Sequence, residues 1–298
     1  MKIVTLTLSP AYDIHMSCDS FTAGRENLAR ITSRDVGGKG INISRALSAF
    51  GAESTALVCL GRENCDEFEA RLSKEDFKSL IIHTDGRIRE NITLHAIGGE
   101  TRISFDAPRI EISLVTDEIK GLSLGEGDLL TVTGRMPDGV DIGSFSELLS
   151  SLSKRGVKIV IDSKSFTLAN ISHISPWLIK PNSEEISVYL GREISDLASL
   201  EASAEEIEKI KSENILVSLG ESGAMLFSTG KRTFKKAPII NAVSTIGAGD
   251  SMIAGFIYAS YLGERGERAL GYAVAFGSAA CLTEGTAPPQ RSDIEKFL

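Results

Sequence analysis

Hydrophobic residues recur along the chain in short runs that alternate with amphipathic helical stretches. Residues 2–8 form a nearly continuous apolar and β-branched run, which is typical of a strand buried on both faces of a parallel sheet. Similar runs predict strands at 54–60, 128–133, 157–162, 177–180 and 214–219, and a hairpin that pairs 224–228 with 232–236. Helices are predicted near 39–50, 113–123, 141–155, 183–190, 195–212, 250–262 and 267–283. This alternation predicts an α/β fold with a mostly parallel sheet flanked by helices.

Two segments, 14–34 and 87–107, depart from the alternation. Both consist of short alternating strands with turns, and the second contains a hairpin that turns at Gly98, Gly99 and Glu100. We expect them to form a small β-sheet lid over the functional site, as insertions in a single domain that spans residues 1–298. Exposed sheet faces of this kind are often covered by a second subunit, so we also expect a homodimer formed through the lid.

Composition narrows the class of protein. The chain has 298 residues, of which 42% are hydrophobic, and can therefore bury a sizeable core. A net charge of −8 argues against a nucleic-acid surface, which needs a clustered basic face. No apolar run approaches the ~20 residues that span a bilayer, and the N-terminus enters a strand directly, so we expect a cytoplasmic protein without a membrane partner. The cysteines and histidines show no spacing typical of a disulfide framework or a structural zinc site.

A glycine-rich stretch precedes the predicted helix at 250–262. Gly247, Ala248 and Gly249 leave room for a ligand, and Asp250 stands at or near the helix N-terminus. Free backbone N–H groups and the helix dipole favour an anion there, while the aspartate is expected to stay ionised and able to accept a proton. The alternative is a helix cap, since aspartate is a common N-cap residue.

An earlier loop pairs glycines with a positive charge. Gly37, Gly38 and Gly40 bracket Lys39, so the backbone can approach a ligand closely while the lysine supplies charge. A flexible turn with a solvated lysine is the alternative. Because the chain is acidic, an anionic ligand needs local positive charge, and the candidates that lie near unusual glycines or in short strands are Lys39, Arg25, Arg89 and Arg102.

Asp13 follows the first predicted strand. Ligands of open α/β sheets bind at the carboxyl ends of the strands, which makes Asp13 a candidate for ligand binding. A turn-forming role is an equal alternative for an aspartate at this position.

Three ordered motifs together resemble the PfkB branch of the ribokinase-like sugar kinases, over nearly the whole chain. The early motif is Gly37-Gly38-Lys39-Gly40-Ile41-Asn42, the middle one is Asn182-Ser183-Glu184-Glu185, and the late one is Gly247-Ala248-Gly249-Asp250. The segments at 5–13 and 89–91 resemble those of the phosphofructokinase and tagatose-phosphate kinase group. Ser9 and Ser244 differ from the residues usual in the family, and the second difference leaves a monovalent-cation requirement open.

The resemblance implies roles on the acceptor side of a kinase site. Lys39 and Arg89 resemble contacts to a phosphate that the acceptor already carries, with Arg102 as a further candidate. Arg25 is a candidate to reach the site of a neighbouring subunit. The residues that resemble those holding sugar hydroxyls are Asp13, Gly38 and Asn42.

The resemblance also implies ATP and Mg²⁺ as cofactors. The residues expected around the nucleotide are Lys180, Asn182, Ser218, Gly220, Gly223 and Ser278. Asn182 and Glu185 would organise Mg²⁺ through water, because this ion keeps much of its hydration. For Glu185 the alternative is a solvated carboxylate on a helix face.

The implied reaction is phosphoryl transfer from ATP to a sugar hydroxyl, with Asp250 as the base and the N–H groups of residues 247–249 as an anion hole. Fructose 1-phosphate is the expected acceptor, and tagatose 6-phosphate and fructose 6-phosphate are the alternatives. An alternative of another class is a non-catalytic regulator that binds sugar phosphate or nucleotide.

Overall fold

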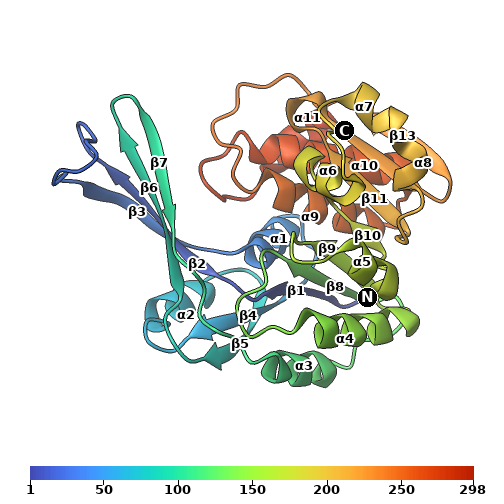
Figure 1. Cartoon of the computed structure of the whole chain (residues 1–298), viewed down its shortest axis with the longest axis horizontal. Coiled ribbons are helices and arrows are strands. Elements are labelled where there is room, and N and C mark those ends of the chain that lie inside the picture. The colour runs from blue at the N-terminus through green and yellow to red at the C-terminus, as the bar shows by residue number, and fades with distance from the viewer.

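A nine-stranded sheet forms the centre of the computed structural model, which describes all 298 residues (Figure 1). Its strands are β1 (Ile3–Thr7), β4 (Thr55–Gly61), β5 (Lys78–Thr84), β8 (Leu129–Thr133), β9 (Lys158–Asp162), β10 (Leu178–Ile179), β11 (Asn214–Ser218), β12 (Ala224–Ser228) and β13 (Lys231–Lys235). Their order is β13-β12-β11-β10-β9-β8-β1-β4-β5. All neighbours from β11 to β5 are parallel, and β12 and β13 add an antiparallel hairpin. Each residue of β1 is buried, as the apolar run predicts.

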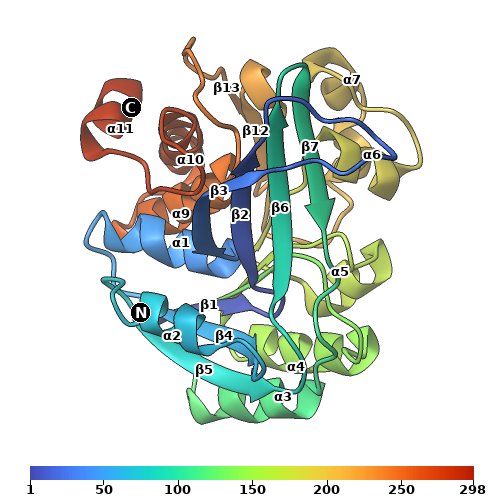
Figure 2. The same ribbon diagram turned by 90° about the vertical axis from the view of Figure 1, so that its left-hand side faces the viewer.

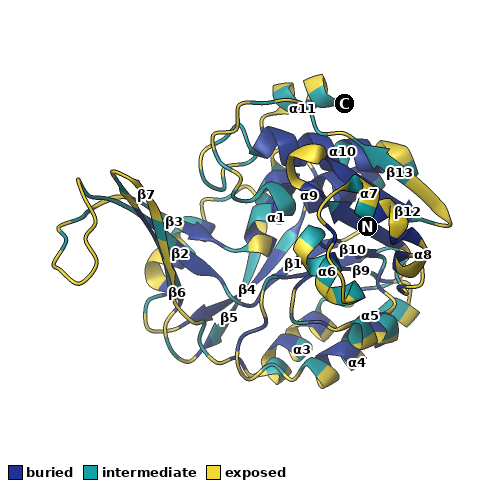
Figure 3. Cartoon of the chain, turned by 45° about the horizontal axis from the view of Figure 1, so that its top comes forward, coloured by how far each residue is buried: buried dark blue, intermediate teal, exposed yellow.

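Helices cover both faces of this sheet. One face carries α1 (Lys39–Ser48), α2 (Asp66–Leu72), α9 (Ala248–Tyr261), α10 (Gly266–Ala280) and α11 (Arg291–Phe297). The other face carries α3 (Ile112–Gly121), α4 (Ile142–Lys154), α5 (Leu168–Ile174), α6 (Ser183–Leu190), α7 (Leu197–Ala202) and α8 (Ala204–Ile207). Figure 3 shows the resulting core as buried residues between the sheet and its helices. None of the helices has the length and apolar character that a membrane span requires.

The predicted alternation is confirmed, with two corrections. The single helix predicted over 195–212 is wrong, because α7 and α8 are separate helices that meet at Ser203, whose φ of −100° and ψ of 0° leave the helical range. Asp13 does not lie in a turn but is the third residue of β2 (Ala11–Ser17). The elements that the apolar pattern did not predict are α2, β5, α5 and α11.

A second sheet of four strands stands away from the main body (Figures 1 and 2), and we call it the small sheet. It consists of β2, β3 (Arg30–Gly37), β6 (Arg89–Ala96) and β7 (Gly99–Ser104), in the order β3-β2-β6-β7. Both predicted insertions, 14–34 and 87–107, contribute strands to it. Segments that lie far apart in the sequence therefore form one unit beside α1.

The two faces of the small sheet differ in character, because successive side chains of a strand point to opposite sides. Asp13 pairs with Asn91 and lies on a polar face. Tyr12, on the opposite face, is fully buried, and its ring meets that of Phe68 in α2 edge-to-face at 5.3 Å between centroids. The same face carries large apolar side chains that are exposed: Ile31 by 61%, Ile103 by 49% and Phe105 by 51%.

Candidate active site

The carboxyl ends of three neighbouring strands bring polar residues to one edge of the main sheet. Asp162 is the last residue of β9, Lys180 directly follows β10, and Ser218 is the last residue of β11. Asn182 forms a parallel bridge with Ser218, whose N–H donates to Pro181 O over 3.1 Å. The structure thus brings these residues together, although Asp162 was not among those predicted.

Asp250 lies in the first turn of α9 and is only 6% exposed. Its Oδ2 accepts a hydrogen bond of 2.9 Å from Asn42 Nδ2 in α1. Burial raises the pKa of this carboxyl to about 6, although the nearby Lys39 ammonium lowers it. Desolvation is the larger effect, but a pKa of about 6 is still consistent with the expectation that Asp250 stays ionised near neutral pH. With this pKa, about nine in ten Asp250 carboxyls are ionised at pH 7.

A buried carboxylate joins the two lysines of the site. Asp162 is 3% exposed, and its oxygens lie 2.6 Å from Lys39 Nζ and 3.4 Å from Lys180 Nζ. Burial alone would raise the pKa of Asp162, but the charges of Lys180 and Lys39 outweigh it and hold that pKa below its usual range. Burial likewise lowers the pKa of Lys39, but the carboxylates of Asp162, Asp250 and Glu185 together outweigh it, so that this pKa is raised. Asp162 therefore fixes two cations beside Asp250.

The start of α9 presents backbone N–H groups next to one of these cations. Gly247 is the N-cap of α9 and adopts the left-handed region at φ 77°, and the N–H of Ser251 donates to Gly247 O over 2.9 Å. The N–H groups of Gly249 and Asp250 precede that bond and are free to bind an anion. The N–H of Ala248 donates a long bond of 3.4 Å to Thr245 O. A Cβ at Gly249 would lie 3.4 Å from the ammonium of Lys180, so the lysine is close to this turn.

Gly38 and Gly40, in the early motif, allow close packing of α1 on β1, in addition to leaving room for a ligand. A Cβ at Gly40 would lie 2.5 Å from Thr7 Oγ1, and one at Gly38 would lie 2.5 Å from the Thr7 methyl group. Only glycine therefore lets the start of α1 approach β1 this closely. The close approach places Lys39 and Asn42 at the carboxyl end of the main sheet.

The small sheet contributes a second group of polar residues. Asn91 Nδ2 donates to Asp13 Oδ1 over 2.8 Å, and Arg89 Nη1 donates to Asn91 Oδ1 over 3.4 Å. Burial lowers the pKa of Arg89. Arg102 pairs with Thr93 across β6 and β7, so it lies on the same face as Asn91. Asn91 was not among the predicted site residues, although its neighbour Arg89 was.

Arg25 lies apart from this group. It is exposed in the connection between β2 and β3, at the outer end of the small sheet (Figure 1). The guanidinium of Arg25 has no polar partner within the chain, so the structure does not bring it into the site of its own subunit.

Asn182 and Glu185 form a capping box at the start of α6. Asn182 Oδ1 accepts from the Glu185 N–H over 2.8 Å, and Glu185 Oε2 accepts from the Asn182 N–H over 3.0 Å. The solvated helix-face alternative for Glu185 is wrong, because its side chain is 15% exposed and holds the helix start. Glu185 Oε1 accepts no hydrogen bond and lies 4.0 Å from Lys164 Nζ, and the charge of this carboxylate also helps to raise the pKa of Lys39. A carboxylate oxygen that accepts no hydrogen bond, beside an amide, suits Mg²⁺ bound through water.

The remaining predicted nucleotide residues lie in the turn that follows β11 and on α10. Gly220 begins a 3₁₀ turn, Gly220–Ser222, with φ 57° and open space where a Cβ would be. Gly223 has a structural reason to lack a side chain, because a Cβ there would collide with the backbone of Lys235 in β13. Ser278 is buried in α10, at 8% exposure.

The model of the pfkB family carbohydrate kinases matches residues 6–293. The chain belongs to the pfkB family. Membership confirms the resemblance carried by the three motifs and makes the protein a carbohydrate kinase, a phosphotransferase with an alcohol group as acceptor. The ribokinase-like α/β fold is likewise confirmed.

The relatives cover nearly the whole of this pfkB-family chain. The 1-phosphofructokinase of Borreliella burgdorferi is 34% identical over 301 aligned positions, covering 99% of this chain and 96% of the relative. The 1-phosphofructokinase of Escherichia coli K12 is 30% identical, covering 94% and 90%. Phosphofructokinase-2 from Escherichia coli, solved in complex with fructose-6-phosphate, superposes with a TM-score of 0.89 at 26% identity, covering 99% and 97%.

A cleft of about 870 Å³ opens between the small sheet and two loops of the kinase body. His15 and Asp35 line it from the small sheet, and the loops at 243–246 and 284–287 line it from the other side. Ser244, the departure from the family motif, lies in the first of these loops. Its hydroxyl accepts from the Ile246 N–H over 3.2 Å, so it supports the turn before α9.

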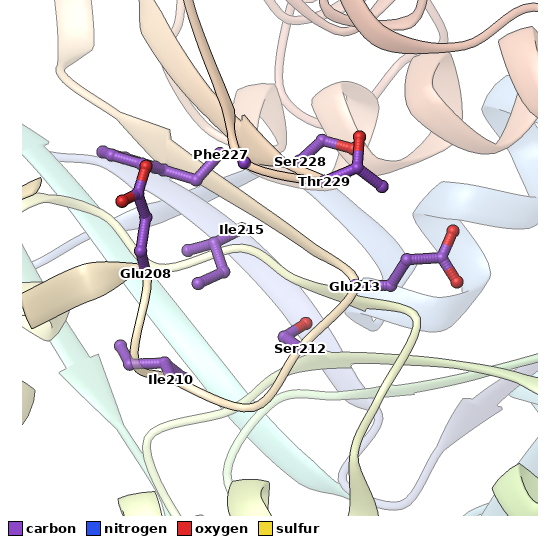
Figure 4. A pocket seen from close by; sticks show the side chains of 9 residues that line it. Glu208, Ile210, Ser212, Glu213, Ile215, Phe227, Ser228 and Thr229 are labelled. Carbon is purple, nitrogen blue, oxygen red and sulfur yellow. The ribbon is translucent and has the colours of Figure 1, made fainter. Parts of the chain in front are cut away.

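A second pocket, of about 300 Å³, lies away from these residues, between the segment after α8 and the β12–β13 hairpin (Figure 4). Of its two charged residues, Glu208 and Glu213, the first already accepts two hydrogen bonds from Arg232, of 2.7 Å and 2.8 Å. With that charge satisfied and none of the motif residues in its lining, the pocket has no part in the kinase site.

Proposed function

We propose that the protein transfers the γ-phosphoryl group of ATP to fructose 1-phosphate and forms fructose 1,6-bisphosphate. The observation that carries this proposal is the group of Asp250, Asn42 and the Lys39–Asp162–Lys180 network at one edge of the sheet. Such a group offers a base, a hydroxyl-binding amide and positive charge within one small volume. The relatives named 1-phosphofructokinase support the choice of acceptor.

Asp250 is proposed as the general base. Asn42 occupies its Oδ2, which leaves Oδ1 to accept the proton of the attacking sugar hydroxyl. The N–H groups of residues 247–249 and the Lys180 ammonium would stabilise negative charge on the moving phosphoryl group. Phosphoryl transfer depends on alignment of the reactants and on charge stabilisation more than on covalent catalysis. These groups are of the types that the reaction requires.

On the acceptor side, Arg89, Arg102 and Lys39 would bind the phosphate that the sugar already carries. Asp13 and Asn42 would hold sugar hydroxyls, with the Gly38 backbone close to them. Support comes from the polar face of the small sheet, which carries Asp13 and Arg102 on one side.

On the donor side, the residues proposed to surround ATP are Lys180, Asn182, Ser218, Gly220, Gly223 and Ser278. Asn182 and Glu185 would hold Mg²⁺ through water, which would neutralise charge on the phosphates when the ion is bound. The open space at Gly220 and the Oε1 of Glu185, which accepts no hydrogen bond, support these assignments.

Residues 1–298 are proposed to form a single domain, in which the small sheet acts as a lid over the site. The exposed apolar side chains Ile31, Ile103 and Phe105 support a homodimer formed through this sheet, since a second copy would remove them from water. Arg25, at the outer end of the small sheet, would then approach the partner's site. We also propose a cytoplasmic location, where ATP is the available phosphoryl donor.

An ADP-release assay with a panel of acceptors tests the function. The panel contains fructose 1-phosphate, fructose 6-phosphate, tagatose 6-phosphate and unphosphorylated fructose. We expect the highest kcat/KM for fructose 1-phosphate and the lowest for fructose. A higher value for tagatose 6-phosphate would reassign the substrate, and ATP binding without turnover on every acceptor would favour a regulator.

A further inference from the structure

Three side chains with metal-binding atoms meet where α2 packs on β5. Cys65 directly precedes α2 with helical backbone angles, φ −80° and ψ −22°, and the Glu69 N–H donates to Cys65 O over 2.9 Å. Residues four apart on a helix share one face, so their side chains project in the same direction. His83 lies on the edge strand β5, and its Nε2 is 2.6 Å from Glu69 Oε1. The thiol sulfur, a carboxylate oxygen and a ring nitrogen all lie within 4.8 Å of one another.

These donors match the preferences of zinc and differ from those of magnesium. Zn²⁺ binds Cys sulfur at about 2.3 Å and His nitrogen or carboxylate oxygen at about 2.0–2.2 Å, so ligand atoms around a tetrahedral ion lie roughly 3.3–3.8 Å apart. Small side-chain rotations bring the three atoms into this range. A thiolate ligand also selects against Mg²⁺, which takes oxygen ligands. The Mg²⁺ that accompanies ATP would therefore not compete for this position.

We propose that Cys65, Glu69 and His83 bind one Zn²⁺ ion per chain, with water or a further oxygen at the fourth position. The ion replaces the proton between His83 Nε2 and Glu69 Oε1 and the proton of the thiol. One thiolate and one carboxylate then balance its charge. Asp66 Oδ1, 3.9 Å from Cys65 Sγ, offers a further oxygen nearby.

Burial and exposure at the three residues suit an ion that enters from solvent. The backbone and thiol of Cys65 are largely buried, at 7% exposure, which fixes the first ligand. The side chains of Glu69 and His83 are each 35% exposed and leave a path to the thiol. None of the three belongs to the kinase site, so the ion is not a cofactor of phosphoryl transfer.

The expected effect of the ion is structural. It would join α2 to β5, which is hydrogen-bonded to only one neighbouring strand. Phe68 of α2 also packs on Tyr12 of β2, so the ion would stabilise the base of the small sheet. Binding to the folded chain alone raises the melting temperature with increasing Zn²⁺ concentration.

Direct binding to tag-free, reduced and chelator-treated protein tests the proposal. Titration with Zn²⁺ against a chromophoric chelator should give one ion per chain. Co²⁺ in its place should produce a thiolate-to-metal charge-transfer band, together with the visible bands of tetrahedral cobalt. The absence of a thiolate band in the wild-type protein would overturn the assignment, whatever the behaviour of variants.

Substitution of the three proposed ligands tests where the ion binds. Cys65→Ser, Glu69→Gln and His83→Gln should each weaken Zn²⁺ binding by at least about 10–100-fold, and Cys65→Ser should abolish the charge-transfer band. Two controls match the chemistry: Cys281→Ser removes another free thiol, and His173→Gln breaks a histidine–glutamate pair at 3.1 Å that has no thiol in the cluster. Both should keep full affinity. Loss of Zn²⁺ binding in the controls, or its retention in Cys65→Ser and His83→Gln, would contradict the site.

Kinase activity in Mg²⁺ is measured separately, so failure of the zinc site leaves the proposed function untouched.

Discussion

The side-chain amide of Asn42 donates a hydrogen bond of 2.9 Å to Oδ2 of Asp250, across 208 residues of sequence. The bond joins the first turns of α1 and α9, the two helices that follow the glycine-rich motifs. It orients the carboxylate and stabilises its ionised form, in opposition to burial. The early motif therefore acts on the proposed base directly, in addition to its proposed contact with the acceptor.

Replacing Asp250 by Asn tests the proposed base. The substitution keeps size and hydrogen bonding but removes the proton acceptor, so kcat should fall by roughly 10²–10⁴-fold. ADP release under saturating substrates measures this. Asp117→Asn makes the same change at an exposed position of α3 and should leave kcat unchanged. An Asp250→Asn variant with near-normal turnover would exclude the carboxylate as the base.

Stability measurements separate this loss of activity from misfolding. Asp250 has a pKa of about 6 in the folded chain and 3.8 as its ordinary value, so its ionisation opposes folding, and the penalty grows as pH rises from about 4 to 6. Above pH 6, Asp250→Asn should therefore raise the free energy of unfolding, on the order of 1–3 kcal/mol. Denaturant unfolding at pH 5 and pH 8 should show a larger gain at the higher pH.

The pH dependence of catalysis should follow the same carboxyl. Since the base must be ionised, kcat/KM should decline below about pH 6, the pKa of Asp250. Asn42→Ala removes a hydrogen bond that lowers this pKa, so the acid limb of the profile should move to higher pH. A profile of the variant that falls in amplitude without a shift would show that Asn42 acts only through substrate binding.

Asp162 should matter for stability as well as activity. Asp162→Asn leaves the Lys180 ammonium, 5% exposed, without its countercharge, and removing one partner of a buried pair costs about 3–5 kcal/mol. Because the folded pKa of Asp162 is lowered, its contribution is present above the ordinary carboxyl pKa and is lost as pH falls through the folded value. The difference in unfolding free energy between wild type and variant should accordingly be large at pH 7 and shrink in strong acid.

Local sequence patterns predict individual strands and helices of this chain, but they do not predict the contacts between elements that complete the site. Lys39 stands out in the sequence because glycines flank it, and Asp250 because a Gly-Ala-Gly run precedes it. The apolar runs predict most strands correctly. Asp162 ends an ordinary apolar strand, and its importance appears only when the sheet order places β9 beside β10. Asn91 depends in the same way on the parallel pairing of β2 with β6, which no local pattern encodes. The raised pKa of Asp250 likewise comes from its burial in the folded chain, which no local pattern encodes.

Removing the charge of Arg89 should raise the KM for fructose 1-phosphate much more than the KM for ATP. Arg89→Gln removes a charge-assisted contact proposed for the acceptor phosphate alone, so KM for fructose 1-phosphate should rise by at least about 10-fold while KM for ATP stays nearly constant. Arg87→Gln provides a matched control, because Arg87 is exposed two residues earlier in the chain. Equal losses for both substrates would indicate that Arg89 supports the fold of the small sheet.

The exposed apolar face of the small sheet should carry the dimer contact. Ile103→Glu places a charge among Ile31, Ile103 and Phe105, and burying that charge in an interface is unfavourable, so the dimer dissociation constant should rise by at least about 10-fold. Sedimentation at several protein concentrations measures the change. Ile239→Glu is the control, since Ile239 is 96% exposed in the segment between β13 and α9 and lies outside the small sheet. Because Ile103 faces away from Asp13 and Asn91, an Ile103→Glu chain should retain ATP binding while it loses self-association. Dimers that withstand Ile103→Glu, or a wild-type chain that sediments as a monomer, would assign this apolar face another role.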